Sequence, residues 1–427
     1  MKMENLAILG GPRSIVAKSP HYIWPRITPA VEHAVIKQLH KTISIYNRSG
    51  VIEEFEMAFA SYHKRKHGLL SNSGTNAIFS MYEGIGLGPG DEVICPAYTF
   101  FATVSPLMHT GATPVFCDCD ENGNIDPVEI EKKITSRTKA VIVTHMWGIP
   151  CDMESISSLC HKHHLLLLED CSHAHGAKFE QRLVGTFGDA AVWSLQAQKT
   201  ITGGEGGILL TDNDEIYYRA LLQGHYNKRC KQEILEEHKL AVFSTTGFGL
   251  KFRAHPLAVA IALEQFSHLD EWLAQREMYA TKMTGAFNQF TFLKTPALRD
   301  GRAGWYAYVM QFDPMRSNGI NIESFTKAVL AEGLVEFDRP KSTSPIYRLP
   351  LFTMPHEALP RLYSHPFGHD ERSFPNAEYF YENALKLPMW AFSDEEDIVD
   401  SYIKGIVKVA SVVRDHPEVL LAAQLSV

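Results

Sequence analysis

Long apolar runs are missing from this 427-residue chain. None approaches 18 residues, so the sequence predicts no membrane-spanning helix. Residues 1–11 also lack the continuous apolar segment of a secretory signal peptide. Basic residues do not predominate, because 41 Lys and Arg stand against 49 Asp and Glu, a formal net charge of −8. Interspersed charges and an acidic balance argue against nucleic-acid binding. We expect a cytoplasmic protein that has neither a membrane nor a nucleic acid as its partner.

Cysteine is scarce, with only seven residues, and their odd number argues against a disulfide framework. Several lie in apolar runs typical of buried strands, which indicates reduced thiols in a cytoplasmic protein. Three groups have a spacing that invites metal binding: Cys117 with Cys119, His173 with His175, and the histidine-rich run 161–164. None is accompanied by a full ligand set, so we expect no metal site.

Repeats and low-complexity tracts are absent too, while 45% hydrophobic and 11% aromatic residues suffice for a full core. Six short apolar runs read as buried strands, at residues 92–95, 113–117, 140–144, 165–169, 190–195 and 207–211. They are continuous rather than alternating, as expected for a mostly parallel sheet covered on both faces. The spacers between them, at residues 99–108, 126–134 and 153–163, are long enough for crossover helices. The sequence therefore predicts an α/β core.

Helical spacing marks further segments, at residues 27–39, 51–62, 73–86, 257–284, 322–332 and 394–413. The sequence pattern changes after the long helical segment 257–284. A segment with strand-like alternation at 305–312 and a proline-rich stretch follow it. We therefore predict three parts: an N-terminal arm over 1–22, a large domain over 23–275 and a smaller C-terminal α+β domain over 276–427.

Lys199 stands just before the glycine-rich turn 203–207, which is neither a dinucleotide nor a P-loop fingerprint. About thirty residues upstream, four leucines end in Glu169 and Asp170. A lysine near a buried carboxylate suits pyridoxal phosphate (PLP). The amine forms a Schiff base with the cofactor aldehyde, and the carboxylate keeps the pyridine nitrogen protonated. Taken alone, such a lysine is more often a solvated surface residue.

Three other features carry two readings each. The turn 73–76 opens a helix and suits a phosphate, but it also suits an ordinary capped helix. The stretch 96–103 could set an aromatic ring against a flat cofactor, or it could be core packing. Asp170 ends a strand at the edge where open α/β sheets bind ligands, and a buried carboxylate there is costly unless it is paired.

These parts follow the order found in fold-type I PLP enzymes, and the chain resembles the DegT/DnrJ/EryC1/StrS family of sugar and aminocyclitol aminotransferases. The resemblance covers almost the whole chain and is strongest at residues 55–75, 88–100, 111–115, 169–176 and 185–207. The arm and residues 194–199 look more like the antibiotic aminocyclitol branch. The resemblance implies an α/β fold of fold type I, with a large domain around a mostly parallel central sheet and a smaller C-terminal α+β domain.

The resemblance also implies roles at the cofactor ring. Lys199 would be the Schiff-base lysine, Asp170 would pair with the pyridinium nitrogen, and Phe100 would stack on one ring face. His173 falls where many members have a glutamine that contacts the phenolic oxygen of the cofactor. We assign Lys199, Asp170 and His173 as catalytic.

For the cofactor phosphate, the resemblance implies contacts from Ser73, Gly74, Thr75 and the Ser194 hydroxyl. Lys251 falls where the family often has an asparagine that reaches the phosphate of the neighbouring subunit's cofactor. A lysine there would act as a point charge. The site would then be shared within a homodimer.

The implied reaction moves an amino group from L-glutamate or L-glutamine to a keto group of a sugar, an aminocyclitol precursor or a related metabolite. Its cofactor would alternate between PLP and pyridoxamine phosphate. Two alternatives stay open: a PLP-dependent sugar dehydratase, whose members replace the lysine by histidine, and a non-catalytic regulator on the same fold. Segments expected to choose the substrate are 22–24, 223–245 and 339–348, with Gln196. Within them, His225, Lys228 and Arg229 suit either a contact with a phosphate or carboxylate or a solvated helix end.

Overall fold

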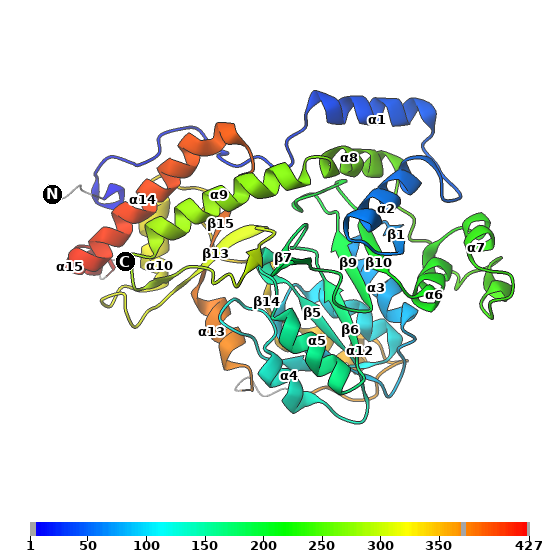
Figure 1. The fold of residues 1–427 in the computed structure, drawn as a ribbon. Coiled ribbons are helices and arrows are strands. Elements are labelled where there is room, and N and C mark those ends of the chain that lie inside the picture. Colours follow the sequence, from blue (N-terminus) through cyan, green and yellow to red (C-terminus); the bar gives the residue numbers. More distant parts are fainter. Residues whose placement is uncertain (1–5, 369–372, 425–427) are drawn as a thin grey trace.

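The computed structural model describes residues 6–368 and 373–424 (Figure 1). Its centre is a seven-stranded sheet in the order β1-β10-β9-β6-β5-β2-β4. The strands are β1 (His67–Ser71), β2 (Glu92–Pro96), β4 (Thr113–Cys117), β5 (Thr138–Thr144), β6 (Leu166–Asp170), β9 (Ala190–Ser194) and β10 (Gly207–Thr211). Only β10 runs against its neighbours. The predicted α/β fold with a mostly parallel central sheet is thus confirmed.

All six predicted strands are present. The seventh, β1, was not predicted from the sequence, because its apolar run is only two leucines long and lies between Gly68 and Ser71. It pairs with the antiparallel β10 at the edge of the sheet.

Helices cover both faces of this sheet (Figure 1). Because successive strand residues point to opposite faces, Leu69 joins one hydrophobic core and Leu70 another. The first core is covered by α3 (Gly74–Gly84) and α6 (Asp214–Gly224). The opposite face is covered by α2 (Gly50–Tyr62), α4 (Pro127–Lys133), α5 (Met153–Lys162) and α8 (Pro256–Phe266).

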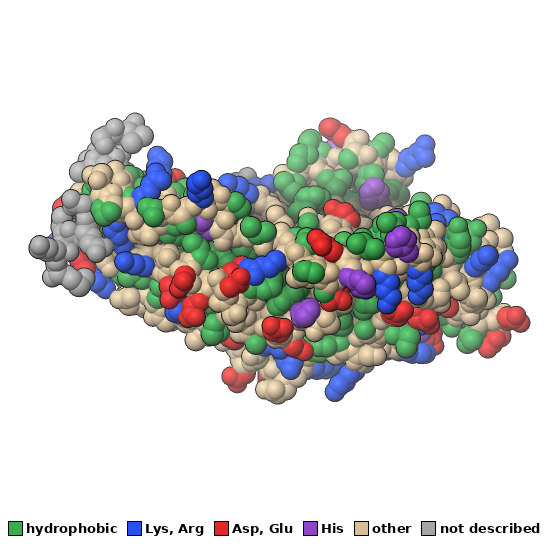
Figure 2. All heavy atoms as spheres, turned by 90° about the horizontal axis from the view of Figure 1, so that it is seen from above, with side chains coloured by type: hydrophobic (Ala, Val, Ile, Leu, Met, Phe, Trp, Pro, Cys, Tyr) green, Lys and Arg blue, Asp and Glu red, His purple; other side chains and the backbone are tan. Residues whose placement is uncertain are grey.

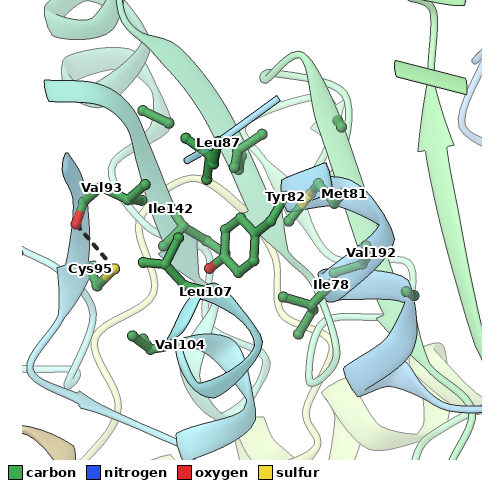
Figure 3. Close-up of a cluster of buried hydrophobic side chains, with 14 of the residues drawn as sticks. Ile78, Met81, Tyr82, Leu87, Val93, Cys95, Val104, Leu107, Ile142 and Val192 are labelled. Atoms are coloured by element: carbon green, nitrogen blue, oxygen red, sulfur yellow. Dashed lines mark hydrogen bonds between the residues drawn. The ribbon is translucent and has the colours of Figure 1, made fainter. Parts of the chain in front are cut away.

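Figure 3 shows the first core around Tyr82 of α3, whose ring lies against apolar side chains from β5 and the 104–107 segment. The ring is fully buried, and its hydroxyl donates a hydrogen bond to the Thr103 carbonyl oxygen at 2.6 Å. A phenol buried in an apolar core needs such an acceptor. This hydrogen bond fixes the segment around Thr103, which lies beside Asp170 at the carboxyl end of β6.

The C-terminal part builds a second core around the antiparallel sheet β11-β13-β15. Its elements are β11 (Leu293–Lys294), β13 (Ala307–Phe312), β15 (Ala384–Pro388), α9 (Leu269–Phe287), α10 (Ile322–Ala331) and α14 (Glu396–Asp415). The N-terminal arm belongs to this core, because Leu6 and Ile15 are buried in it. Conversely, two residues of the C-terminal part, Tyr347 and Phe380, pack into the first core of the large sheet. The predicted division at residue 276 falls inside α9, and the domain boundaries stay a prediction.

Two predicted helices differ from the structure. The single helix expected over 257–284 is broken into α8 and α9, and at the break the Ser267 hydroxyl donates to the Glu264 carbonyl at 2.7 Å. The crossover expected over 99–108 is two 3₁₀ helices, η2 (Phe101–Thr103) and η3 (Ser105–Thr110). The hydroxyls of Thr99 and Thr103 bond to each other there, and such local bonds compete with a regular helix.

The remaining described elements are α1 (Pro29–Lys41), α7 (Asn227–Glu233), α11 (Pro350–Thr353), α12 (Pro355–Ala358), α13 (Pro375–Asn383), α15 (Pro417–Gln424), η1 (Ala7–Leu9), η4 (Met146–Gly148), η5 (Ala241–Phe243), η6 (Ile346–Arg348), η8 (Ser393–Glu395), β3 (Tyr98–Thr99), β7 (Lys178–Phe179), β8 (Arg182–Leu183), β12 (Gly301–Arg302) and β14 (Ser344–Pro345). Within 6–368 and 373–424, no helix is both long and apolar enough to cross a membrane. Side chains of both charges and apolar side chains are mixed over the face in Figure 2.

Candidate active site

A cavity of about 380 Å³ opens where β6 and β9 end and α3 begins. Its wall contains eight of the nine predicted cofactor residues: Ser73, Gly74, Thr75, Phe100, Asp170, His173, Ser194 and Lys199. The strand order explains the meeting, because β6 and β9 are parallel neighbours whose carboxyl ends share one edge.

Lys199 is buried in this wall, with only 9% of its surface exposed. Its Nζ has no hydrogen bond or ion pair within the described ranges, and it lies 4.5 Å from the centroid of the Tyr306 ring. Burial lowers the pKa of the Lys199 amine to about 8, against the opposing effect of the Asp170 carboxylate. A share of the amine is therefore unprotonated near neutral pH, as a nucleophile or a base requires.

The backbone of Lys199 is held from two sides. Its N–H donates to the Gln196 carbonyl oxygen at 2.8 Å. Its own carbonyl oxygen accepts a hydrogen bond from the indole Nε1 of Trp24, also at 2.8 Å. The sequence had placed Trp24 among the substrate-choosing residues, and the structure shows it holding the lysine loop.

Asp170 at the end of β6 is only 3% exposed. One carboxylate oxygen accepts from the Thr103 hydroxyl at 2.8 Å, and the other accepts from the Ser172 N–H at 3.0 Å. These two donors hold the carboxylate in place and leave lone pairs for a further donor. Thr103 itself is tied to Tyr82 in the core, so the carboxylate is held by the packed interior.

His173 lies flat on Tyr306, with ring centroids 4.0 Å apart and an interplanar angle of 4°. Its Nδ1 is buried and has no partner among the described residues. Burial, and then the charge of Lys199, hold the pKa of His173 well below its usual range. The ring is therefore neutral at pH 7 and has one N–H to donate and one nitrogen to accept.

The N-terminus of α3 forms the other side of the cavity. Ser73 caps the helix, its hydroxyl accepting from the Asn76 N–H at 3.1 Å. The N–H groups of the first turn, including those of Gly74 and Thr75, have no acceptor inside the helix, which suits an anion. A Cβ at position 74 would lie 2.7 Å from Ser194 Cβ, so only glycine permits this approach of α3 to β9.

The two remaining predicted cofactor residues, Phe100 and Lys251, are both exposed, but only Phe100 lines the cavity. Phe100 is 37% exposed at the cavity, with its ring centroid 4.3 Å from that of Phe101. Lys251 does not line the cavity of its own chain. It is exposed, and its Nζ donates to the His225 carbonyl oxygen at 3.2 Å. Its predicted contact with a neighbouring subunit stays a prediction.

Sequence reasoning left part of the cavity wall without a role: Ile78, Ala102, Thr103, Ser172, Gln198, Glu205 and Tyr306. Thr103 closes the aromatic stretch 96–103, so its position beside Asp170 could have been suspected. Tyr306 arrives from a distant part of the chain, and no local pattern points to it.

Two buried charged side chains that do not line the cavity, Arg229 and Glu169, have partners of their own. Arg229 is 3% exposed and forms a two-pronged pair with Glu56, at 2.9 and 2.8 Å, so it is neither a solvated helix end nor open to an anion. Glu169 lies with His145 and Cys171 in a buried group of metal-ligand type. Burial alone would raise the pKa of Glu169, but hydrogen bonds from His145 and the Gly188 N–H lower it, which accounts for this carboxylate as a structural one.

The cavity fits a pyridoxal-type cofactor on its own features. It contains the buried Lys199 amine, which has no hydrogen-bond partner among the described residues, and the hydrogen-bonded Asp170 carboxylate at the end of a strand. It also contains the unpartnered Nδ1 of His173 and the N-terminus of α3, where Gly74 allows a close approach. The amine and the imidazole nitrogen would be costly in an apolar interior unless they met a ligand.

Known proteins resemble this chain over most of its length. The model of the DegT/DnrJ/EryC1/StrS aminotransferase family matches residues 30–403. The spore coat polysaccharide biosynthesis protein SpsC of Bacillus subtilis is 33% identical over 403 residues, which are 93% of this chain and 100% of SpsC. A proposed L-glutamine:3-amino-2,3-dideoxy-scyllo-inosose aminotransferase of Micromonospora echinospora is 32% identical over 420 residues, covering 95% and 97% of the two chains.

A solved structure, that of an aminotransferase from Psychrobacter cryohalolentis, superimposes with a TM-score of 0.78 at 25% identity and covers 93% of this chain and 100% of its own. Family and fold together define a transaminase of the PLP-dependent class. The chain belongs to the DegT/DnrJ/EryC1/StrS aminotransferase family.

Proposed function

We propose that this protein transfers an amino group from L-glutamate or L-glutamine to a keto group of a sugar, an aminocyclitol precursor or a related metabolite. The observation that carries the proposal is the buried Lys199 amine, which shares one cavity with Asp170 and the open N-terminus of α3. The family and the named relatives support amino transfer to sugars and cyclitols. We propose further that the protein acts in the cytoplasm, which its seven free, buried cysteines support.

Pyridoxal phosphate, when bound, would supply an aldehyde that holds the amino group and a ring that accepts electrons from the reacting carbon. Lys199 would attach to that aldehyde, and Asp170 would hold the proton on the ring nitrogen. Gly74, Thr75 and Ser194 would bind the phosphate. His173, as a neutral ring, would donate its N–H to the phenolic oxygen rather than act as a charged acid.

Proton transfer is the work of Lys199. Released by the incoming amine, its amino group would take the proton from the donor's α-carbon as a base. It would then return that proton, as an acid, to the cofactor's C4′ carbon on the other side of the amino nitrogen. The pKa of about 8 suits both tasks near neutral pH.

We also propose a homodimer in which Lys251 reaches the partner's cavity. Its exposure supports this, since an exposed lysine outside its own cavity is free to serve a neighbour. The alternative of a sugar dehydratase is disfavoured by Lys199, because dehydratases of this family carry histidine there. A non-catalytic regulator is disfavoured by the intact wall of the cavity.

The test replaces Lys199 by alanine. The Lys199→Ala protein keeps its fold and loses amino transfer by about 10⁴-fold or more, because both nucleophile and base are removed. Lys404→Ala, an exposed lysine on α14, serves as the control and keeps wild-type activity. Near-normal transfer by Lys199→Ala would refute the assignment.

A further inference from the structure

Tyr306 lies between two residues to which the reaction gives a role, yet it has none of its own. One contact is with His173, whose ring lies 4.0 Å away and parallel within 4°. The other is with Lys199, whose Nζ lies 4.5 Å from the tyrosine centroid. The tyrosine hydroxyl donates to Gln198 Oε1 at 3.3 Å, on the loop that carries Lys199. One side chain thus touches the imidazole, the amine and the lysine loop.

The backbone holds Tyr306 in this place. Its N–H donates to the Trp147 carbonyl oxygen at 3.0 Å, and the Gly304 N–H donates to the Gly148 carbonyl oxygen at 2.8 Å. These two bonds fasten the segment 304–306 to η4, the short helix that follows β5. A Cβ on Gly148 would lie 2.5 Å from the Trp305 nitrogen, so the two segments touch backbone to backbone.

These two backbone hydrogen bonds form a short ladder. Two tryptophans in it have positive φ, 58° at Trp147 and 43° at Trp305. Bulky residues rarely adopt this region, so the backbone is strained at both positions. Such strain is retained where the surroundings over-determine it, which happens mostly at functional sites. Trp147 also lies beside His173, with ring centroids 5.6 Å apart. The strained backbone therefore places the stacked rings of Trp147, His173 and Tyr306 beside one another at the cavity.

We propose that Tyr306 is a positioning residue: its ring fixes the plane of His173 and gives the Lys199 amine a resting place on its face. The proposal rests on the proposed function, since it concerns the same cavity. Flat stacking resists rotation of the imidazole, whose unpartnered Nδ1 has no hydrogen bond to orient it. The ring face attracts the ammonium form of the lysine, which retains the amine beside His173 when it is not attached to a cofactor.

The test compares Tyr306→Leu, which removes the ring, with Tyr306→Phe, which keeps the ring and loses the hydroxyl. The first measurement uses cofactor-free protein: the pH dependence of Lys199 acylation, read by peptide mass spectrometry. Loss of a cation–π contact of about 0.5–1 kcal/mol lowers the pKa of the lysine by roughly 0.4–0.7 in Tyr306→Leu. Tyr306→Phe keeps the wild-type value.

The second measurement follows amino transfer in the loaded enzyme. In Tyr306→Leu, kcat falls about 10- to 100-fold while KM for the donor changes less than about threefold, because misplaced groups slow the chemical step more than binding. Tyr306→Phe restores most of the rate. Tyr379→Leu is the matched control: it removes a ring 5.6 Å from Lys294 Nζ outside the cavity and leaves both readings unchanged.

Tyr306→Met repeats both measurements if Tyr306→Leu does not fold. A Lys199 pKa that is the same with and without the ring would overturn the proposal, as would equal losses in the Phe and Leu variants. The acylation profile does not depend on catalysis. A wild-type protein without amino transfer would therefore refute the proposed function and still leave the role of Tyr306 decided by its own result.

Discussion

At the scale of single residues, the chemistry of Lys199 comes from burial more than from any partner. The amine has no hydrogen-bond acceptor among the described residues, and burial is the largest influence on its pKa. Asp170 acts in the opposite direction, because a nearby negative charge favours the ammonium form. The two effects together leave the amine close to half protonated near pH 8.

This balance makes a prediction for the cofactor-free protein. The pH profile of Lys199 acylation has its midpoint at about 8, and Asp170→Asn moves it lower, because only the opposing charge is removed. Asp189→Asn is the control. Asp189 lies outside the cavity, where it accepts a hydrogen bond from the Leu167 N–H, so this variant leaves the profile unchanged. A midpoint near 10.5, the ordinary lysine value, would show that the amine is not desolvated.

Sequence reasoning finds residues such as Lys199 and Asp170 because local motifs mark them: a lysine before glycines and an aspartate ending an apolar strand. It misses Tyr306, which is brought to the cavity by a backbone ladder between segments about 160 residues apart in sequence. No periodicity in either segment encodes that ladder. Contacts made by tertiary packing are thus the part of the site that the sequence does not show.

At the scale of elements, the cavity depends on how closely α3 approaches β9. The contact point is Gly74, where a side chain would overlap Ser194. The free N–H groups of the helix and the Ser194 hydroxyl are brought to one place by this approach. Helix and strand therefore build the predicted phosphate site jointly.

Gly74→Ala tests this approach. An added Cβ 2.7 Å from Ser194 Cβ displaces the helix end and weakens PLP binding by about 10-fold or more, while the fold is retained at a cost of about 1–3 kcal/mol. The measurement is PLP affinity from absorbance, with the free energy of unfolding from denaturant. Gly88→Ala is the control, since nothing lies within 4 Å of its Cβ. Unchanged PLP affinity in Gly74→Ala would contradict the phosphate role of this helix end.

The elements themselves were largely predictable. Continuous apolar runs bounded by turns specify strands such as β4 and β10, and cap residues with proline specify the start of α1. What failed were features decided by contacts over longer range. The apolar run of β1, two leucines, is too short for the strand to be recognised without its pairing to β10. The break between α8 and α9 interrupts an unbroken helical periodicity.

At the scale of the whole molecule, the proposed dimer explains why Lys251 lies outside its own cavity. If it acts across the interface, Lys199 and Lys251 of one complete site come from different protomers. Mixed dimers of two inactive variants then regain one complete site each.

Lys251→Ala and Lys199→Ala are therefore mixed, dissociated and reassociated. Each variant alone is strongly impaired, and the equimolar mixture recovers roughly a quarter of wild-type activity, since half of the dimers are mixed and each has one complete site. Mixing either variant with itself is the control. No recovery, in dimers shown to have exchanged protomers, would place Lys251 outside the partner's site.

The central claim is amino transfer, and the most direct measurement is a half-reaction on the purified protein with PLP. L-glutamate, L-glutamine and L-alanine are added separately while the visible absorbance of the bound cofactor is followed. The account predicts that L-glutamate or L-glutamine converts the visible band into the near-ultraviolet band of pyridoxamine phosphate, with release of the matching 2-oxo acid. A protein that binds PLP yet shows no conversion with any of the three donors would contradict the account.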